Sequence, residues 1–438
     1  MSYKYNYMKA ILLLLLISWT HLINAQLQNG PMLGYVNHRE VAIWVQTHDE
    51  AKVEIIYHSV GSNKPYIEST QTSNNQANTA TIVADSLQSG TTYQYQIKVN
   101  NQFVGDKDRY FKFSTQKLWQ WREKPLEWKI ALGSCTYINE KEYDRPGKPY
   151  GGDYSIFNAV HEKEPDIMLW LGDNIYMREV DFYGLSGYQK RYTHSRDIKP
   201  LQKLLAQTHH YAIWDDHDYG PNNSDRSNVH KYDALTAFKQ FWANPTYGFD
   251  GNQCAVTQFK YNDAEFFLLD NRWFRSPNKR KTGKREYLGE KQLQWLIDAL
   301  VTSTATFKFI AVGGQVLNDA PVYENYATYP EERAKLLNLL VEEELKNVIF
   351  LTGDRHKTEL SKIKRNGIVF YDLTVSPLTS TAYNSSDEPN QNRVEGTHYA
   401  KRNFSILEFS GDFKNRQLKM CVFDKVGRQV WSKTITKQ

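Results

Sequence analysis

The sequence contains four apolar runs that are each followed at once by a cluster of polar residues. These runs restrict the possible folds of the chain more strongly than any other feature of the sequence. The clusters read Gly-Ser-Cys at 133–135, Gly-Asp-Asn-Ile-Tyr at 172–176, Trp-Asp-Asp-His-Asp at 214–218 and Gly-Asp-Arg-His at 353–356. Short continuous apolar runs of this kind are typical of strands buried in the central sheet of an α/β domain. Because ligands bind at the carboxyl ends of strands in such sheets, we expect the four clusters to meet in one site.

The surrounding sequence supports an α/β domain over residues 126–438. Apolar residues recur at i, i+3 and i+4 in four stretches, which predicts helices over 154–164, 233–242, 290–300 and 331–345. Strand-like runs alternate with these helices at 129–132, 166–171, 211–214, 266–269, 307–312 and 347–351. The segment 358–436 returns to strands.

Residues 26–118 show strand after strand and predict a small N-terminal β-sandwich. The runs 40–46, 52–57 and 93–99 alternate apolar and polar residues, and Ser, Asn and Gly clusters separate them. The stretch 87–95 resembles the corner before a late strand of fibronectin type III domains, in which a tyrosine hydroxyl reaches back to the chain. Such a module either packs on the larger domain or binds sugars or a partner.

The first 25 residues have the pattern of a secretory signal peptide. Lys4 and Lys9 precede an apolar run over 10–19, and Ala25 offers a small residue at the cleavage site. The alternative is an uncleaved anchor, but a run of ten residues is shorter than the roughly 20 that cross a bilayer. We therefore expect a protein exported to the periplasm or the cell exterior, with no transmembrane span in its mature chain.

Composition excludes several classes of protein. The chain of 438 residues is 40% hydrophobic and 24% charged, which is too polar for a multi-span membrane protein and too apolar for a disordered one. Its net charge of +5 falls to +3 without the two leader lysines, so we expect no specific nucleic-acid binding. Cys135, Cys254 and Cys421 are too few for a disulfide scaffold, and the last two are either buried thiols or a pair.

The series Gly-Asp-x-x-Tyr, x-Asp-His-Asp and Gly-Asp-x-His resembles the dinuclear metallophosphoesterase superfamily. Three altered blocks, Ser-Cys in the first, Asp-Asp-His-Asp in the third and Gly-Asp-Arg-His in the last, together resemble the alkaline phosphatase D (PhoD-like) family. That family also carries an N-terminal β-domain, so the resemblance covers nearly the whole mature chain. It implies a four-layer αββα metallophosphoesterase sandwich preceded by a small fibronectin III-like β-sandwich.

The first metal that this resemblance implies is Fe(III). Thiolate, carboxylate, phenolate and imidazole groups together suit a trivalent transition metal. The residues at the matching positions are Cys135, Asp173, Tyr176 and His356.

The second implied metal is calcium, as one or more ions. Asp173 bridges to it, and Asp216 and Asp354 supply further hard oxygen ligands of the kind that calcium favours. Asp216 takes the superfamily's Asn position in the third block, while Asp215 is the alternative.

One superfamily block is missing from this chain. The superfamily usually has a lone histidine between the third and last blocks, and this stretch contains only His230, too soon after the third block. The run ending at 313–315 occupies its place in order, so Gln315 or Asn318 is the candidate to supply oxygen instead.

The implied mechanism is attack on phosphorus by a metal-bound hydroxide, because two cations neutralise the phosphoryl oxygens and lower the pKa of a bound water. His217 is the candidate to protonate or stabilise the leaving oxygen, with Asp218 to orient it, and a buried structural histidine is the alternative. The candidates to hold the phosphate in fork geometry, unless they are solvated surface charges, are Arg272, Arg275 and Arg355.

We therefore predict an exported, metal-dependent hydrolase of phosphate esters that acts on phosphomonoesters, phosphodiesters or both. Its substrate is a small-molecule or polymer phosphate ester. One alternative is a dedicated phosphodiesterase or phospholipase D-like enzyme. The other is a non-catalytic surface binding protein, which loss of ligand residues would favour. The proposed ligands and the acid candidate are all in place, namely Cys135, Asp173, Tyr176, Asp216, Asp354, His356 and His217.

Overall fold

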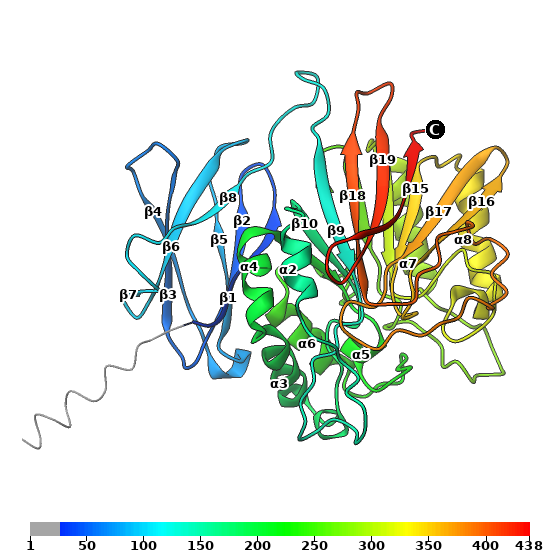
Figure 1. The fold of residues 1–438 in the computed structure, drawn as a ribbon, viewed down its shortest axis with the longest axis horizontal. Coiled ribbons are helices and arrows are strands. Elements are labelled where there is room, and N and C mark those ends of the chain that lie inside the picture. Colours follow the sequence, from blue (N-terminus) through cyan, green and yellow to red (C-terminus); the bar gives the residue numbers. More distant parts are fainter. Residues whose placement is uncertain (1–26) are drawn as a thin grey trace, which may run out of the picture.

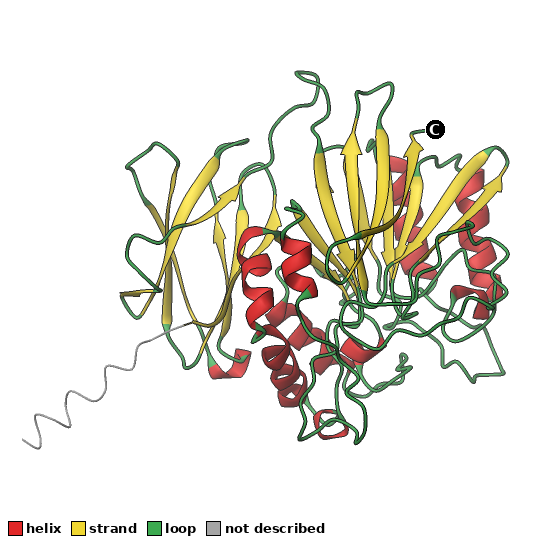
Figure 2. Ribbon diagram, viewed as in Figure 1, coloured by secondary structure: helices red, strands yellow, loops and turns green. Residues whose placement is uncertain are grey.

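The computed structural model describes residues 27–438, so the predicted signal peptide with its cleavage after Ala25 lies outside the described residues. Two large β-sheets stack face to face, and helices cover both outer faces (Figure 1). A smaller sheet packs at one end of this body (Figure 2). Within residues 27–438, no helix has the length and apolar character needed to cross a membrane.

The first sheet has nine strands in the order β20-β19-β18-β9-β10-β11-β1-β2-β5. Strands β9, β10 and β11 are parallel, so their carboxyl ends lie at one edge. The strands are β1 (Leu27–Val36), β2 (Val41–Thr47), β5 (Thr79–Ala84), β9 (Trp128–Gly133), β10 (Ile167–Leu171), β11 (His209–Ile213), β18 (Asn403–Ser410), β19 (Gln417–Asp424) and β20 (Gln429–Thr436).

The second sheet has six strands in the order β12-β13-β14-β15-β17-β16. Strands β13, β14, β15 and β17 are parallel. The strands are β12 (Thr257–Tyr261), β13 (Ala264–Leu268), β14 (Phe307–Val312), β15 (Val348–Thr352), β16 (Glu359–Arg365) and β17 (Ile368–Thr374).

Helices lie on both outer faces of the two sheets (Figure 1). The first sheet is covered by α2 (Ile156–His161), α3 (Leu185–Arg196), α4 (Lys199–Gln207) and α6 (Lys231–Phe241). The second sheet is covered by α7 (Glu290–Thr302) and α8 (Pro330–Glu342). The short helices are α5 (Asp216–Tyr219), η1 (Asn74–Gln76), η2 (Glu179–Asp181) and η3 (Tyr326–Thr328).

Helices α2, α6, α7 and α8 lie near their predicted positions, whereas the sequence analysis missed α3 and α4. The buried face of α3 contains Arg191 and Arg196 besides Tyr188 and Tyr192, so apolar periodicity does not mark it. In α4 the apolar face is built from three leucines within only nine residues, which is short for a periodic signal.

The central strands bury both faces, because each sends alternate side chains into two different cores. In β10, Leu169 and Leu171 pack between the two sheets, while Met168 and Trp170 pack against the helices. This double burial explains why the runs in the sequence are continuously apolar. The predicted four-layer αββα sandwich is therefore confirmed.

The N-terminal strands share a sheet with the main body. The smaller sheet consists of β3 (Lys52–Ser59), β4 (Tyr66–Gln71), β6 (Thr92–Val99), β7 (Gln102–Phe103) and β8 (Phe111–Ser114). It packs against β1, β2 and β5, which continue into the first large sheet. In β2, Ile43 points into this N-terminal core, while Trp44 packs toward the helices and donates to Gln240 O at 2.7 Å.

Two details bear on the predicted N-terminal module. The Tyr93 hydroxyl accepts a hydrogen bond from Gln88 N at 2.9 Å, so this tyrosine reaches back to the chain as expected. The boundary predicted at residue 118 falls in the strand-free stretch between β8 and β9. The likeness of residues 26–118 to a fibronectin III domain, and their separation from the catalytic domain as a module of their own, remain predictions.

Candidate metal centre

Four loops bring the predicted ligand residues together between the carboxyl ends of β9, β10, β11 and β15. Ligand atoms of Cys135, Asp173 and His356 lie within 4.8 Å of one another. The same limit holds for the set Asp173, Asp216 and His217, and for the set Asp215, Asp216 and Asp354. Asp173 and Asp216 therefore connect three overlapping groups into one centre.

The first half of the centre surrounds Asp173 Oδ2. This oxygen accepts from the Tyr176 hydroxyl at 2.9 Å and from Cys135 Sγ at 3.5 Å. The Tyr176 hydroxyl lies 3.1 Å from His356 Nε2. His356 Nδ1 lies 2.5 Å from the carbonyl oxygen of Thr381, which can only accept, so Nδ1 carries the proton. His356 Nε2 is therefore the free ligand atom and faces the centre.

The backbone at these ligands is strained. Cys135, Asp173, Asp354 and His356 adopt φ angles of 58°, 52°, 62° and 51°, in the left-handed region that side chains other than glycine rarely occupy. Each such residue costs of order 1–3 kcal/mol and persists only where the surroundings enforce it. Four of them in one cluster indicate a functional site.

The second half of the centre contains carboxylates with too few hydrogen-bond donors. Asp215 Oδ1 accepts from Arg272 Nε at 2.5 Å and from Asn271 Nδ2 at 2.8 Å. Asp215 Oδ2 and Asp216 Oδ1 are buried and have no hydrogen-bond partner. Unsatisfied buried oxygens are costly, and a bound cation would satisfy both.

Glycine at 313 makes room for one of these carboxylates. It directly follows β14, and a Cβ there would lie 2.4 Å from Asp215 Cγ. At the position that chain order gives the superfamily's missing histidine, this chain has a glycine, and the carboxylate of Asp215 lies against it. The amide oxygens of the proposed substitutes bond elsewhere, because Gln315 Oε1 accepts from Arg355 Nη1 at 2.7 Å and Asn318 Oδ1 accepts from Ala320 N at 2.9 Å.

Burial and mutual repulsion dominate the electrostatics. Burial, followed by the charges of Cys135 and the neighbouring aspartates, raises the pKa of Asp173 well above its ordinary value. The pKa of Asp354 rises to about 7 and that of Asp215 to about 6, with burial as the main cause. Burial also raises the pKa of Cys135 to about 12. The carboxylates and the thiolate thus need positive charge nearby to stay ionised together.

Asp216 is the exception among the carboxylates. Burial favours its neutral form, but the charges of His217 and Arg272 outweigh this effect and hold the pKa of Asp216 below its ordinary value. Asp216 Oδ2 also accepts from Asn223 N at 2.6 Å. Asp216 is therefore the carboxylate of this group that most readily stays charged.

His217 lies at the centre, but the carboxylate of its predicted partner Asp218 bonds to other groups. The His217 ring packs against the Tyr176 ring with centroids 4.2 Å apart, and burial lowers its pKa. The carboxylate of Asp218 accepts instead from Asp215 N, Asn174 N and the Tyr192 hydroxyl at 3.0–3.1 Å. The prediction that Asp218 orients His217 is therefore wrong, because Asp218 ties the loops after β10 and β11 together.

The three predicted phosphate-binding arginines are paired with carboxylates of the protein. Arg272 and Arg275 are fully buried and donate to the two oxygens of Glu324 at 2.7 and 2.9 Å. Arg355 donates to Glu388 at 2.5 Å. The sequence analysis missed Glu324 and Glu388, since each lies in a loop with no motif to mark it.

Two features lie outside the centre. Cys254 and Cys421 are free and buried in different apolar clusters, so they do not form a pair.

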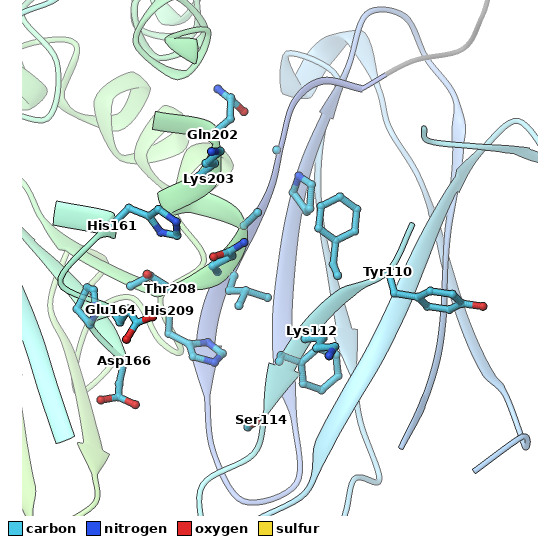
Figure 3. A pocket seen from close by; sticks show the side chains of 18 of the residues that line it. Tyr110, Lys112, Ser114, His161, Glu164, Asp166, Gln202, Lys203, Thr208 and His209 are labelled. Atoms are coloured by element: carbon cyan, nitrogen blue, oxygen red, sulfur yellow. The ribbon is translucent and has the colours of Figure 1, made fainter. Parts of the chain in front are cut away.

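A cavity of about 1040 Å³ lies between the N-terminal strands and the helices α2 and α4, lined by Lys112, His161, Asp166 and His209 among others (Figure 3). It lies at the amino ends of β10 and β11, opposite the candidate centre.

Comparison with known proteins agrees with this architecture. A family model described as PhoD-like phosphatase matches residues 130–417, and one described as a domain of unknown function matches residues 24–116. Alkaline phosphatase D of Bacillus subtilis (strain 168) is 22% identical, over 91% of this chain and 72% of that protein.

Two solved structures share the fold. The structure of PhoD has a TM-score of 0.74 at 18% identity and covers 92% of this chain and 88% of its own. A purple acid phosphatase from yellow lupin (Lupinus luteus) seeds has a TM-score of 0.64 at 12% identity and covers 93% of this chain and 74% of its own.

The space at Gly313 yields a test of the centre. In Gly313→Ala the new methyl group must displace the Asp215 carboxylate, so we predict metal affinity at least about tenfold weaker than wild type. Element analysis after dialysis against graded metal concentrations measures this. Gly34→Ala, at a glycine of β1, is the matched control, because its methyl would meet Ala243 Cβ at the same distance of 2.4 Å but away from the centre. Equal metal affinity in Gly313→Ala and wild type would contradict the assignment.

Proposed function

Because the chain belongs to the PhoD-like phosphatase family, we propose that the centre between its two sheets hydrolyses phosphate esters with the help of bound metal ions. The chain is a phosphoric ester hydrolase by this membership. The unpaired buried oxygens of Asp215 and Asp216 are the observation that carries the metal dependence. We also propose export, which the leader pattern over residues 1–25 supports.

The donor set supports two kinds of ion. We assign Fe(III) to the thiolate, carboxylate, phenolate and imidazole of Cys135, Asp173, Tyr176 and His356. We assign one or more calcium ions to the hard oxygens of Asp173, Asp216 and Asp354, joined by Asp215. When bound, such ions supply Lewis-acid chemistry that neutralises phosphoryl oxygens and lowers the pKa of a water ligand.

The protein's own groups prepare the centre for this chemistry. Thr381 fixes the tautomer of His356, and the strained backbone aims Asp173 and Asp354 inward. Arg272 holds one oxygen of Asp215 and leaves the other free. Since Arg272, Arg275 and Arg355 are all paired with carboxylates, we propose that they position the ligand loops and do not grip the phosphate.

We propose that His217 assists the departure of the leaving oxygen. Its ring lies against Tyr176, and its backbone N–H donates to Asp173 Oδ1 at 3.4 Å. An imidazole is neutral under alkaline conditions, and burial lowers the pKa of His217 further, so the ring offers an N–H as a hydrogen-bond donor to the departing oxygen.

Two alternative functions differ from this proposal in what the centre does. A dedicated phosphodiesterase or phospholipase D-like enzyme would use the same centre, and only substrate preference separates it from a monoesterase. A non-catalytic binding protein is disfavoured, because the ligand residues are gathered in one cluster and the family is one of phosphatases.

The proposed function is tested by paired rates on p-nitrophenyl phosphate and bis-p-nitrophenyl phosphate. The protein is purified without chelators and assayed at alkaline pH with calcium. Faster monoester hydrolysis supports a phosphomonoesterase, and faster diester hydrolysis supports the phosphodiesterase alternative. Turnover of neither substrate, with iron and calcium added, would refute a phosphoesterase. Asp173→Ala, purified identically, controls for contaminating phosphatases.

The metal assignment predicts colour, since a tyrosine phenolate bound to ferric iron absorbs visible light. We expect iron and calcium in the purified protein by element analysis, and a visible band that Tyr176→Phe abolishes. Tyr137→Phe is the matched control, because its ring lies 5.1 Å from Tyr176 but its hydroxyl donates to Asp144. A colourless wild type with full activity would rule out the iron assignment.

The role of His217 predicts a dependence on the leaving group. His217→Ala is expected to lower kcat by about 10²-fold or more on an alkyl phosphate, and by much less on p-nitrophenyl phosphate, whose leaving oxygen needs little assistance. His230→Ala, at a half-buried histidine bonded to Asp233, should leave both rates unchanged. Equal losses on both substrates would exclude the proposed role.

A further inference from the structure

An exposed tyrosine is held against a residue of the metal centre. Tyr383 lies in the long loop between β17 and β18, and its backbone N–H donates to His356 O at 3.0 Å. Its ring stacks on the His356 ring with centroids 5.3 Å apart and an angle of 27° between planes. The Tyr383 hydroxyl donates to the Tyr150 hydroxyl at 3.3 Å. Tyr383 is therefore held at three places, namely its backbone N–H, one face of its ring and its hydroxyl group.

Despite these anchors, the Tyr383 side chain remains 52% exposed. An exposed aromatic ring beside the centre leaves apolar area that a bound ligand can still remove from water. A second exposed tyrosine, Tyr323, lies on the neighbouring residue Arg355, with its ring centroid 4.9 Å from the guanidinium and 78% of its surface exposed. The segment 354–356 thus carries a ligand carboxylate and a ligand imidazole flanked by two accessible rings.

The direction in which the Tyr383 side chain extends from the metal centre bears on substrate binding. His356 Nε2 points inward to Tyr176, whereas the stacked ring of Tyr383 continues outward toward solvent. A phosphate ester whose phosphoryl group reached the centre would extend its alcohol portion outward from it. A ring that is already immobilised binds at little further cost in side-chain entropy.

We propose that Tyr383 is a specificity-determining residue that stacks against a planar ring in the alcohol portion of the substrate. The structure thus assigns the enzyme to phosphate esters that carry an aromatic ring next to the phosphate, such as aryl esters, over small alkyl esters. This inference rests on the proposed function, since it places the phosphoryl group at the metal centre. Offset stacking of two aromatic rings supplies the preference.

The test measures binding of two non-hydrolysable probes, phenylphosphonate and methylphosphonate, to the full-length metal-loaded protein by calorimetry. Tyr383→Ala is expected to weaken phenylphosphonate binding by about tenfold and methylphosphonate binding by less than about twofold. Tyr383→Phe keeps the ring and is expected to keep the preference. Tyr66→Ala, which removes a 44% exposed tyrosine from β4, is the control.

Each outcome decides the inference. A preference for the phenyl probe that only Tyr383→Ala abolishes supports it. An equal loss for both probes means that Tyr383 merely supports His356, and no loss, or no preference in the wild type, also overturns the inference. Hydrolysis of phenyl phosphate and ethyl phosphate is measured in parallel. Ring-dependent binding without any hydrolysis would leave the inference standing and refute the proposed function, whereas hydrolysis without ring-dependent binding would do the reverse.

Discussion

The gathering of anionic side chains in a buried space is the constraint on which the rest of this structure depends. Asp173, Asp215, Asp216 and Asp354 lie with Cys135 between two sheets, and the pKa values of all of them except Asp216 are raised mainly by burial. Among residues 27–438, Arg272 is the one guanidinium that donates directly to this group, at Asp215. Such a centre is favourable only with further positive charge in place, which is why its unpaired oxygens support bound cations.

The fold supplies the geometry that this constraint demands. Parallel strands from both sheets end at the same place, so ligands from loops more than 200 residues apart meet. The local backbone then bends to aim them, with left-handed φ angles at four ligand residues and glycine at 313 beside Asp215. The buried ion pairs of Glu324 with Arg272 and Arg275 hold the loop after β13 in place beside the centre. The strain and the ion pairs belong to one arrangement that holds the carboxylates close together.

The sequence analysis succeeded where a signal was local. Continuous apolar runs predicted strands buried on both faces, and the polar clusters after them predicted where ligand residues gather. It missed α3, since the buried face of that helix contains arginines as well as tyrosines. It misplaced the partner of His217, because residue spacing cannot tell whether Asp218 turns toward the imidazole or toward the backbone of Asp215 and Asn174. It did not find the carboxylate partners of the predicted arginines, because Glu324 and Glu388 lie far from them in the sequence.

By itself the sequence determined that the chain forms an α/β domain and which residue types make up the centre, whereas the two-sheet sandwich was implied only by the family resemblance. Both follow from short-range properties, namely the period of apolar residues and the polar groups directly after a strand. Only the tertiary structure decided which carboxylates remain unpaired, which arginines are neutralised by the protein, and that Asp215 fills the space above Gly313. It also decided that Tyr383 stacks on His356 and stays exposed. These outcomes depend on contacts between segments distant in sequence, because the energy of a buried charge is set by its neighbours in space.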